Sequence, residues 1–166
     1  MPGNNITRAE AAERSAHLKV HHYDVTIDVT QGDETFIATT KVTFSCDKPG
    51  YATFIDAVGK RIISAQLNGV AVDTSSFDGE SLNLKDLKAE NELEVSVEAI
   101  YSKSGEGLQR SVDPVDNEVY LYSQGETAFI RNMYPCFDQP DLKSTFTFTA
   151  IAPSHWEVIS NNPLAK

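Results

Sequence analysis

The amino-acid sequence predicts an all-β fold, an antiparallel β-sandwich with a short helix at its N-terminus. Residues 20–29 alternate between two sides, with His21, Tyr23 and Val25 on one and Val20 and His22 on the other, as in a strand with one buried face. Many short β-rich segments follow, separated by turns about every eight to twelve residues. This spacing is typical of a sandwich.

The helix is predicted from a capping box at its start. Thr7 can cap the first turn with its hydroxyl, and Glu10, three residues later, can reach back to the backbone of Thr7. The alanine-rich residues that follow favour a helix that continues to about Leu18.

The remaining elements are predicted to be strands. Residues 35–46 are rich in Thr, Val and Phe and form a long hairpin with residues 20–29 across the turn at 31–34. Asn68 and Gly69 predict a type I′ hairpin turn, because both residue types tolerate positive φ. The other predicted strands are 52–56, 62–67, 70–72, 81–84, 93–101, 119–123, 145–151 and 156–160.

The segment 102–117 is a long polar stretch with no clear period. Loops of this length in a compact domain are usually functional or disordered, so it is either a functional loop or a flexible hairpin tip.

Composition indicates one globular domain over residues 1–166. The chain has 40% hydrophobic and 23% charged residues, and a chain of this length buries roughly 70% of its unfolded surface. It contains no internal repeat and no linker. A net charge of −10 disfavours binding to nucleic acid and to anionic membranes.

The cellular location is predicted to be the cytoplasm. No apolar run approaches the ~20 residues of a membrane span, and residues 1–5 lack the basic and apolar regions of a signal peptide. Two cysteines, Cys46 and Cys136, are too few for a disulfide scaffold and are not spaced as zinc ligands.

No metal ligands and no catalytic residues are predicted within this chain. His21 and His22 project from opposite faces of a strand, and His155 is not part of a His-Glu-x-x-His sequence. Cys136 has no paired histidine nearby in the sequence, which favours a packed side chain over a nucleophile.

The candidate ligand-binding residues are Gln124 and Glu126. They lie two residues apart at the end of a predicted strand, so in extended backbone an amide and a carboxylate project to the same side. Residue types alone favour an ordinary polar surface over a binding site. Arg131 can pair with Asp138 or Asp141 and hold the turn between them, which is a structural role.

Several motifs in order resemble the N-terminal domain of M1-family zinc aminopeptidases, the aminopeptidase N type. Residues 105–116 are most similar to the actinobacterial branch, and the likeness extends over the whole chain. The motifs are residues 123–126 (SQGE), Arg131, residues 135–140 (PCFDQP), residues 143–146 (KSTF) and residues 160–161 (SN).

The resemblance implies a role for each candidate residue. Glu126 would bind the free amino terminus of a peptide substrate, and Gln124 would line the pocket for its first side chain. Two departures from the family pattern imply a reshaped pocket: Gly125 replaces a larger residue, and Phe129 and Ile130 replace more polar ones.

The resemblance also implies that zinc belongs to the parent protein and not to this chain. The family's Gly-x-Met-Glu-Asn and His-Glu-x-x-His motifs are missing here, so the catalytic domain is expected on the same polypeptide beyond an excised or truncated N-terminal domain. This chain alone is then expected to be inactive. The alternatives are a stand-alone binding or scaffold module for peptide, glycan or protein partners, and the epoxide-hydrolysing branch of the family.

Overall fold

The computed structural model describes residues 5–164 and places the predicted helix at Arg8–His17 (α1). The capping box is confirmed: the Glu10 amide donates to Thr7 Oγ1 at 3.2 Å, and the Thr7 amide donates to Glu10 Oε2 at 2.7 Å. The helix ends at His17 because Leu18 is already extended, and the first strand begins there.

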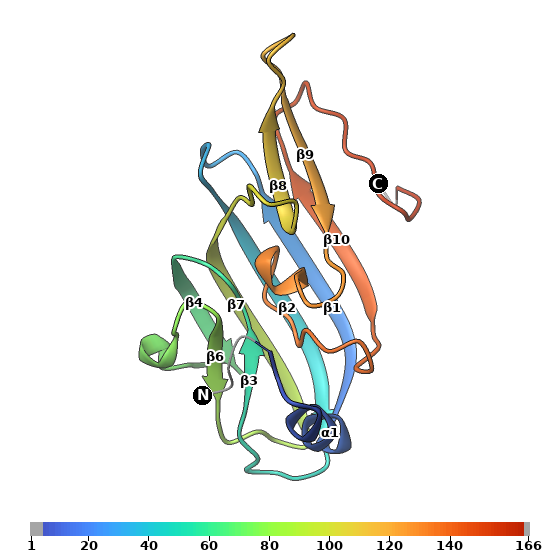
Figure 1. Ribbon diagram of the computed structural model, residues 1–166. Coiled ribbons are helices and arrows are strands. Elements are labelled where there is room, and N and C mark those ends of the chain that lie inside the picture. The colour runs from blue at the N-terminus through green and yellow to red at the C-terminus, as the bar shows by residue number, and fades with distance from the viewer. Residues whose placement is uncertain (1–4, 165–166) are drawn as a thin grey trace.

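A six-stranded sheet forms one layer of the molecule (Figure 1). Its strand order is β10-β1-β2-β7-β4-β5, and all neighbours are antiparallel except β1 and β10, which are parallel. The strands are β1 (Leu18–Asp28), β2 (Thr35–Cys46), β4 (Arg61–Leu67), β5 (Val70–Ala71), β7 (Glu90–Ile100) and β10 (Thr145–Ile151).

The second layer consists of shorter elements that cover one face of this sheet. Leu82, Leu84 and Phe137 from this layer share the core with Phe36 and Phe44 from β2, all at most 4% exposed. This packing confirms the predicted all-β fold. The elements are β3 (Thr53–Asp56) paired with β6 (Ser81–Leu84), β8 (Gly107–Val112) paired with β9 (Val119–Gln124), and the 3₁₀-helices η1 (Thr74–Ser76) and η2 (Ile130–Asn132).

Local turn chemistry agrees with the sequence at the β4–β5 hairpin. Asn68 and Gly69 have φ values of 55° and 78°, as a type I′ turn requires. Positive φ is uncommon for most residue types, but asparagine and glycine adopt it at little steric cost.

Two predicted segments differ in the structure. Residues 102–117 are not one long loop, because β8 lies within them and pairs with β9, so that a short tip at 113–118 remains. Residues 156–160 do not form a strand. Their backbone pairs with no other strand of the described part of the chain, and Val158 and Ile159 are exposed.

Residues 1–4 and 165–166 lie outside the described residues, and most of the segment searched for a signal peptide falls there. No helix within residues 5–164 is long and apolar enough to cross a membrane. The extent of the domain over 1–166 stays a prediction.

Candidate functional site

Gln124 and Glu126 lie where the chain leaves β9. Gln124 is the last residue of the strand and faces Gly107 of β8, and both Gln124 and Glu126 are exposed. The Gln124 amide Nε2 donates to the backbone carbonyl of Glu126 at 3.1 Å. Within residues 5–164 the Glu126 carboxylate has no hydrogen bond or ion pair, so it can accept a ligand without breaking an internal contact.

Glu126 borders an open hollow of about 510 Å³. Tyr134 and Phe146 supply apolar surface in it, and Lys143 supplies a positive charge. Gln124 does not line this hollow. Of the two predicted binding residues, only Glu126 does.

The turn that carries Glu126 depends on Gly125. The Phe129 amide donates to the Gly125 carbonyl at 3.1 Å, which closes the chain back on itself. A Cβ at Gly125 would lie 2.6 Å from Ile130 Cγ1, closer than real side chains pack. Gly125 and Ile130 are therefore two sides of one contact.

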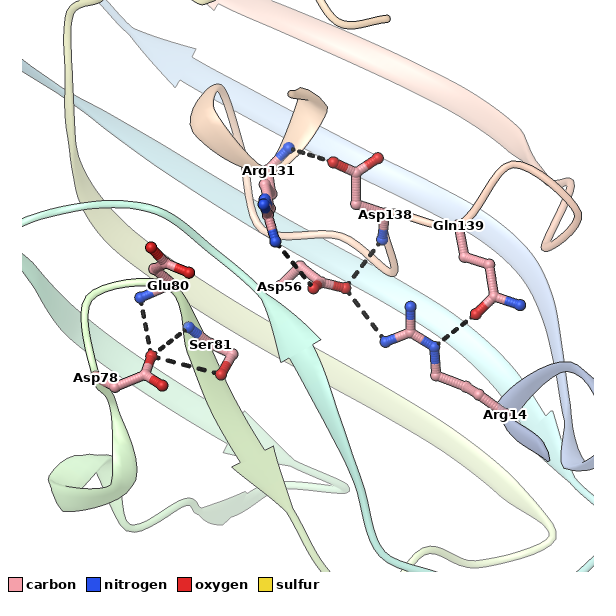
Figure 2. Close-up of polar contacts among 8 residues, drawn as sticks. All are labelled: Arg14, Asp56, Asp78, Glu80, Ser81, Arg131, Asp138 and Gln139. Atoms are coloured by element: carbon pink, nitrogen blue, oxygen red, sulfur yellow. Dashed lines mark hydrogen bonds and ion pairs between the residues drawn. The ribbon is translucent and has the colours of Figure 1, made fainter. Parts of the chain in front are cut away.

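A buried polar cluster joins α1, the end of β3 and residues 131–139 (Figure 2). Arg14 from α1 ion-pairs with Asp56 at the end of β3, with Nη1 and Oδ2 3.2 Å apart, and donates from Nε to Gln139 Oε1 at 2.8 Å. The Asp138 amide donates to the same Asp56 oxygen at 3.1 Å. The Arg131 guanidinium lies 3.9 Å from the other Asp56 oxygen.

The predicted contact between Arg131 and Asp138 is a hydrogen bond from backbone to side chain and not an ion pair between the two side chains. The backbone amide of Arg131 donates to Asp138 Oδ2 at 3.2 Å, while its guanidinium faces Asp56. The Asp56 side chain contacts Arg14 of α1 and both Arg131 and Asp138, so this cluster fixes the 131–139 segment against α1 and β3.

Burial dominates the electrostatics of this cluster. Burial raises the pKa of Asp56, and the charge of Arg14 opposes the rise. Burial also raises the pKa of Asp138, against the hydrogen bond from the Arg131 amide. The two carboxyl groups are held by fixed donors and serve to position the chain.

Sequence reasoning missed Arg14, Asp56 and Gln139 as members of this cluster. Arg14 sits in an alanine-rich helix and Asp56 ends an apolar strand, and only the fold brings them within hydrogen-bond distance. The one available signal was the charge at the end of the apolar strand, since a buried charge needs a partner.

The structure gives Cys136 a packing role, as predicted. The side chain is buried, and burial raises the pKa of its thiol well above the usual value. In the described part of the chain, no group of three His, Cys, Asp or Glu side chains comes close enough to hold a metal ion. His21 lies by Glu90 and His22 by Asp24, so the two rings diverge.

Comparison with known proteins identifies the family. The model of the peptidase M1 N-terminal domain matches residues 19–166. Aminopeptidase N of Streptomyces lividans is 42% identical over 167 residues, covering 98% of this chain and 20% of that protein. Leucyl aminopeptidase of Saccharolobus solfataricus is 27% identical over 154 residues, covering 90% and 18%. The chain therefore spans about a fifth of the length of these relatives.

Solved structures agree at the level of the fold. A mutant of the M1 zinc metallopeptidase from Deinococcus radiodurans superposes with a TM-score of 0.61 at 25% identity, covering 81% of this chain and 32% of that one. Aminopeptidase A of Legionella pneumophila gives a TM-score of 0.67 at 17% identity, covering 81% and 16%. This chain belongs to the peptidase M1 N-terminal domain family.

Proposed function

We propose that this chain is the substrate-anchoring domain of a zinc aminopeptidase, an enzyme that removes amino acids from the amino end of peptides. The observation that carries the proposal is the exposed Glu126 carboxylate, which has no partner within residues 5–164 and follows β9 in a chain 42% identical to an aminopeptidase N.

The chemistry of the anchor follows from charge. A peptide amino terminus is an ammonium group, and its hydrogen bond to a carboxylate is charge-assisted. Holding that group at Glu126 fixes which peptide bond reaches the reacting centre, so only the first residue is released. The neighbouring Gln124 amide can contact the first side chain of the peptide once it leaves the Glu126 carbonyl.

Zinc does not fit this chain by itself, because residues 5–164 hold no group of three candidate ligands. We therefore assign the metal and the chemical step to a catalytic domain on the same polypeptide. A net charge of −10 weakly favours a cationic group such as a peptide amino terminus and argues against nucleic acid or an anionic membrane as partners. The unpaired, buried Cys46 and Cys136 support a cytoplasmic location.

Replacing Glu126 in the intact enzyme tests this function. E126A removes a charge-assisted hydrogen bond worth about 1.5–3 kcal/mol, so kcat/KM for an aminoacyl p-nitroanilide should fall about 10- to 150-fold. Bound zinc, measured by mass spectrometry, should not change. The matched control is E118A, which removes a carboxylate just before the other end of β9.

Unchanged kcat/KM in E126A would remove Glu126 from the binding site. Zinc-dependent release of amino acids by the purified 166-residue chain would contradict the assignment of the metal and the chemical step to another domain.

A stand-alone glycan-binding module is the second candidate. Tyr120 and Tyr122 share one face of β9 and are each 53% exposed, as stacking platforms for sugars would be. The mass of the native gene product separates the two functions. A product near 18.3 kDa favours the binding module, and a product several-fold heavier favours the enzyme.

A further inference from the structure

The turn between β4 and β5 pairs a reactive side chain with an unshielded backbone nitrogen. Asn68 is the only asparagine of the sequence that is followed by glycine. No atom lies within 4 Å of the position that a Cβ on Gly69 would take. Because glycine also has no side chain of its own, nothing shields its backbone nitrogen from the Asn68 side chain.

This pair of residues can lose ammonia in an intramolecular reaction. The Gly69 nitrogen attacks Asn68 Cγ, and the new C–N bond closes a succinimide ring. The bond from Cγ to Nδ2 breaks, and the proton of the Gly69 nitrogen leaves with the ammonia. Water then opens the ring at one of its two carbonyls, which gives aspartate or isoaspartate. The reaction needs no reagent other than water.

The fold holds the Asn68 side chain at both of its polar atoms. Asn68 Nδ2 donates to Asn91 Oδ1 at 3.1 Å, and Asn68 Oδ1 accepts from the Glu92 amide at 3.0 Å. The backbone amide of Asn68 also donates to the Glu92 carbonyl at 2.7 Å. Asn91 and Glu92 both belong to β7. Asn68 Cγ is therefore not free to turn toward the Gly69 nitrogen until the side-chain bonds open.

The two sides of this contact differ in how firmly they are held. Asn91 is 5% exposed, and its side chain also accepts from the Lys88 amide at 2.9 Å and donates to the Lys88 carbonyl at 2.7 Å. Strand β5, in contrast, has two residues, both exposed, and pairs only with β4 in the described part of the chain. Such a segment opens at a lower free energy than the core, so the turn can separate from β7 while the rest of the sheet stays folded.

We propose that Asn68 is a deamidation site whose rate is set by local opening of the β4–β5 turn from β7. The reaction replaces the Nδ2 donor with a carboxylate oxygen, which only accepts hydrogen bonds at neutral pH. That oxygen would face Asn91 Oδ1, another acceptor, and Asn91 cannot turn its own amide donor toward it without losing both bonds to Lys88. Deamidation therefore prevents the turn from closing as before. The inference is independent of the proposed function.

Peptide mapping by mass spectrometry tests the site in the intact protein. The protein is incubated in native buffer and in guanidinium chloride at the same pH and temperature. The peptide that contains Asn68 is then followed for the replacement of NH2 by OH and for isoaspartate. Because two side-chain hydrogen bonds must open first, we expect the native rate to be about 5- to 150-fold below the rate of the unfolded chain.

Two variants separate local opening from global unfolding. N91A removes the acceptor of Asn68 Nδ2, so the native rate at Asn68 should rise toward the rate of the unfolded chain. T7A is the matched control, because Thr7 caps α1 and takes no part in the turn. T7A lowers the stability of the whole chain and should leave the native rate unchanged.

Each other outcome overturns the proposal. Equal rates in native buffer and in guanidinium chloride would show that the fold does not hold the side chain. No conversion in guanidinium chloride would show that Asn68 is not a reactive site. An unchanged native rate in N91A would remove Asn91 as the anchor, and an equal acceleration in T7A would show that the opening is global.

Discussion

Replacing Arg14 with methionine tests whether the cluster around Asp56 holds the second layer in place. The Arg14 and Asp56 side chains are 3% and 5% exposed, so both charges are removed from water. Removing one partner of such a pair costs about 3–5 kcal/mol, because the other charge stays buried without compensation. Methionine keeps an apolar stem over the Phe54 ring, which limits the loss of packing. We expect R14M to lower the free energy of unfolding by about that amount at pH 7.

Thermal and urea unfolding of the 166-residue chain, followed by circular dichroism, measure this loss. Each kcal/mol changes Tm by about 2–4 °C at this chain length, so Tm should fall by about 6–20 °C. Circular dichroism is the suitable probe because the single tryptophan, Trp156, lies outside the sheets. The control is R61M: Arg61 pairs with Glu98 at 2.9 Å but is 64% exposed, so its loss should cost about 0–1 kcal/mol.

The deficit of R14M should also depend on pH. Burial raises the pKa of Asp56 and Arg14 lowers it, so the pKa rises further when Arg14 is removed. A carboxyl whose folded pKa exceeds its unfolded value of about 3.9 holds its proton more firmly in the folded state. Stability therefore falls as pH rises between these two pKa values and then levels off.

We accordingly expect the R14M deficit to be smallest near pH 4 and to grow until the pH exceeds the folded pKa of Asp56. A deficit under about 1 kcal/mol at pH 7, the level of an exposed pair, would refute the reasoning. A deficit that grows toward acid would refute it as well.

Three further outcomes are expected of the same chain. G125A should lower the free energy of unfolding by about 1–3 kcal/mol in urea, and I130A in the same chain should restore part of it. T7A should cost about 1 kcal/mol in urea, while T7S, which keeps the capping hydroxyl, should cost less. Cys46 and Cys136 should react with a thiol reagent only as fast as the chain unfolds, and rapid labelling in native buffer would contradict their burial.

Local signals predicted the elements whose structure is decided locally. The capping box at Thr7 and the Asn68-Gly69 turn each depend on residues within one turn of chain, and both are present. The periodic hairpin of β1 and β2 was predictable because its buried face repeats every second residue.

Elements whose structure depends on distant partners were not predictable in this way. Residues of β8 are mixed in polarity, and the strand forms because its backbone pairs with β9. Residues 156–160 have the composition of a strand, yet no neighbouring edge pairs with them in the described part of the chain. Strand propensity therefore decided neither segment, as expected when the availability of a partner dominates.

The candidate site also contains one residue that local sequence predicts and one contact that depends on distant parts of the chain. The sequence indicated Glu126 because a carboxylate follows a strand in a recognisable motif, and the structure places it exposed beside a hollow. The Arg14–Asp56 contact joins residues 42 positions apart and depends on the whole fold. A one-dimensional pattern cannot contain such a contact, although the rule that buried charges require partners could have directed the search to Asp56.

The contact between Gly125 and Ile130 changes how these two residues are interpreted. Taken separately in the sequence, Gly125 and the apolar pair Phe129-Ile130 each imply a differently shaped pocket. In the structure Ile130 occupies the space that a side chain at position 125 would need. The volumes of the side chains at 125 and 130 are therefore linked, as they are for residues in direct contact. A larger residue at 125 would force the Ile130 side chain to shift or would need a smaller one in its place, so the two residues together set the turn from which Glu126 follows.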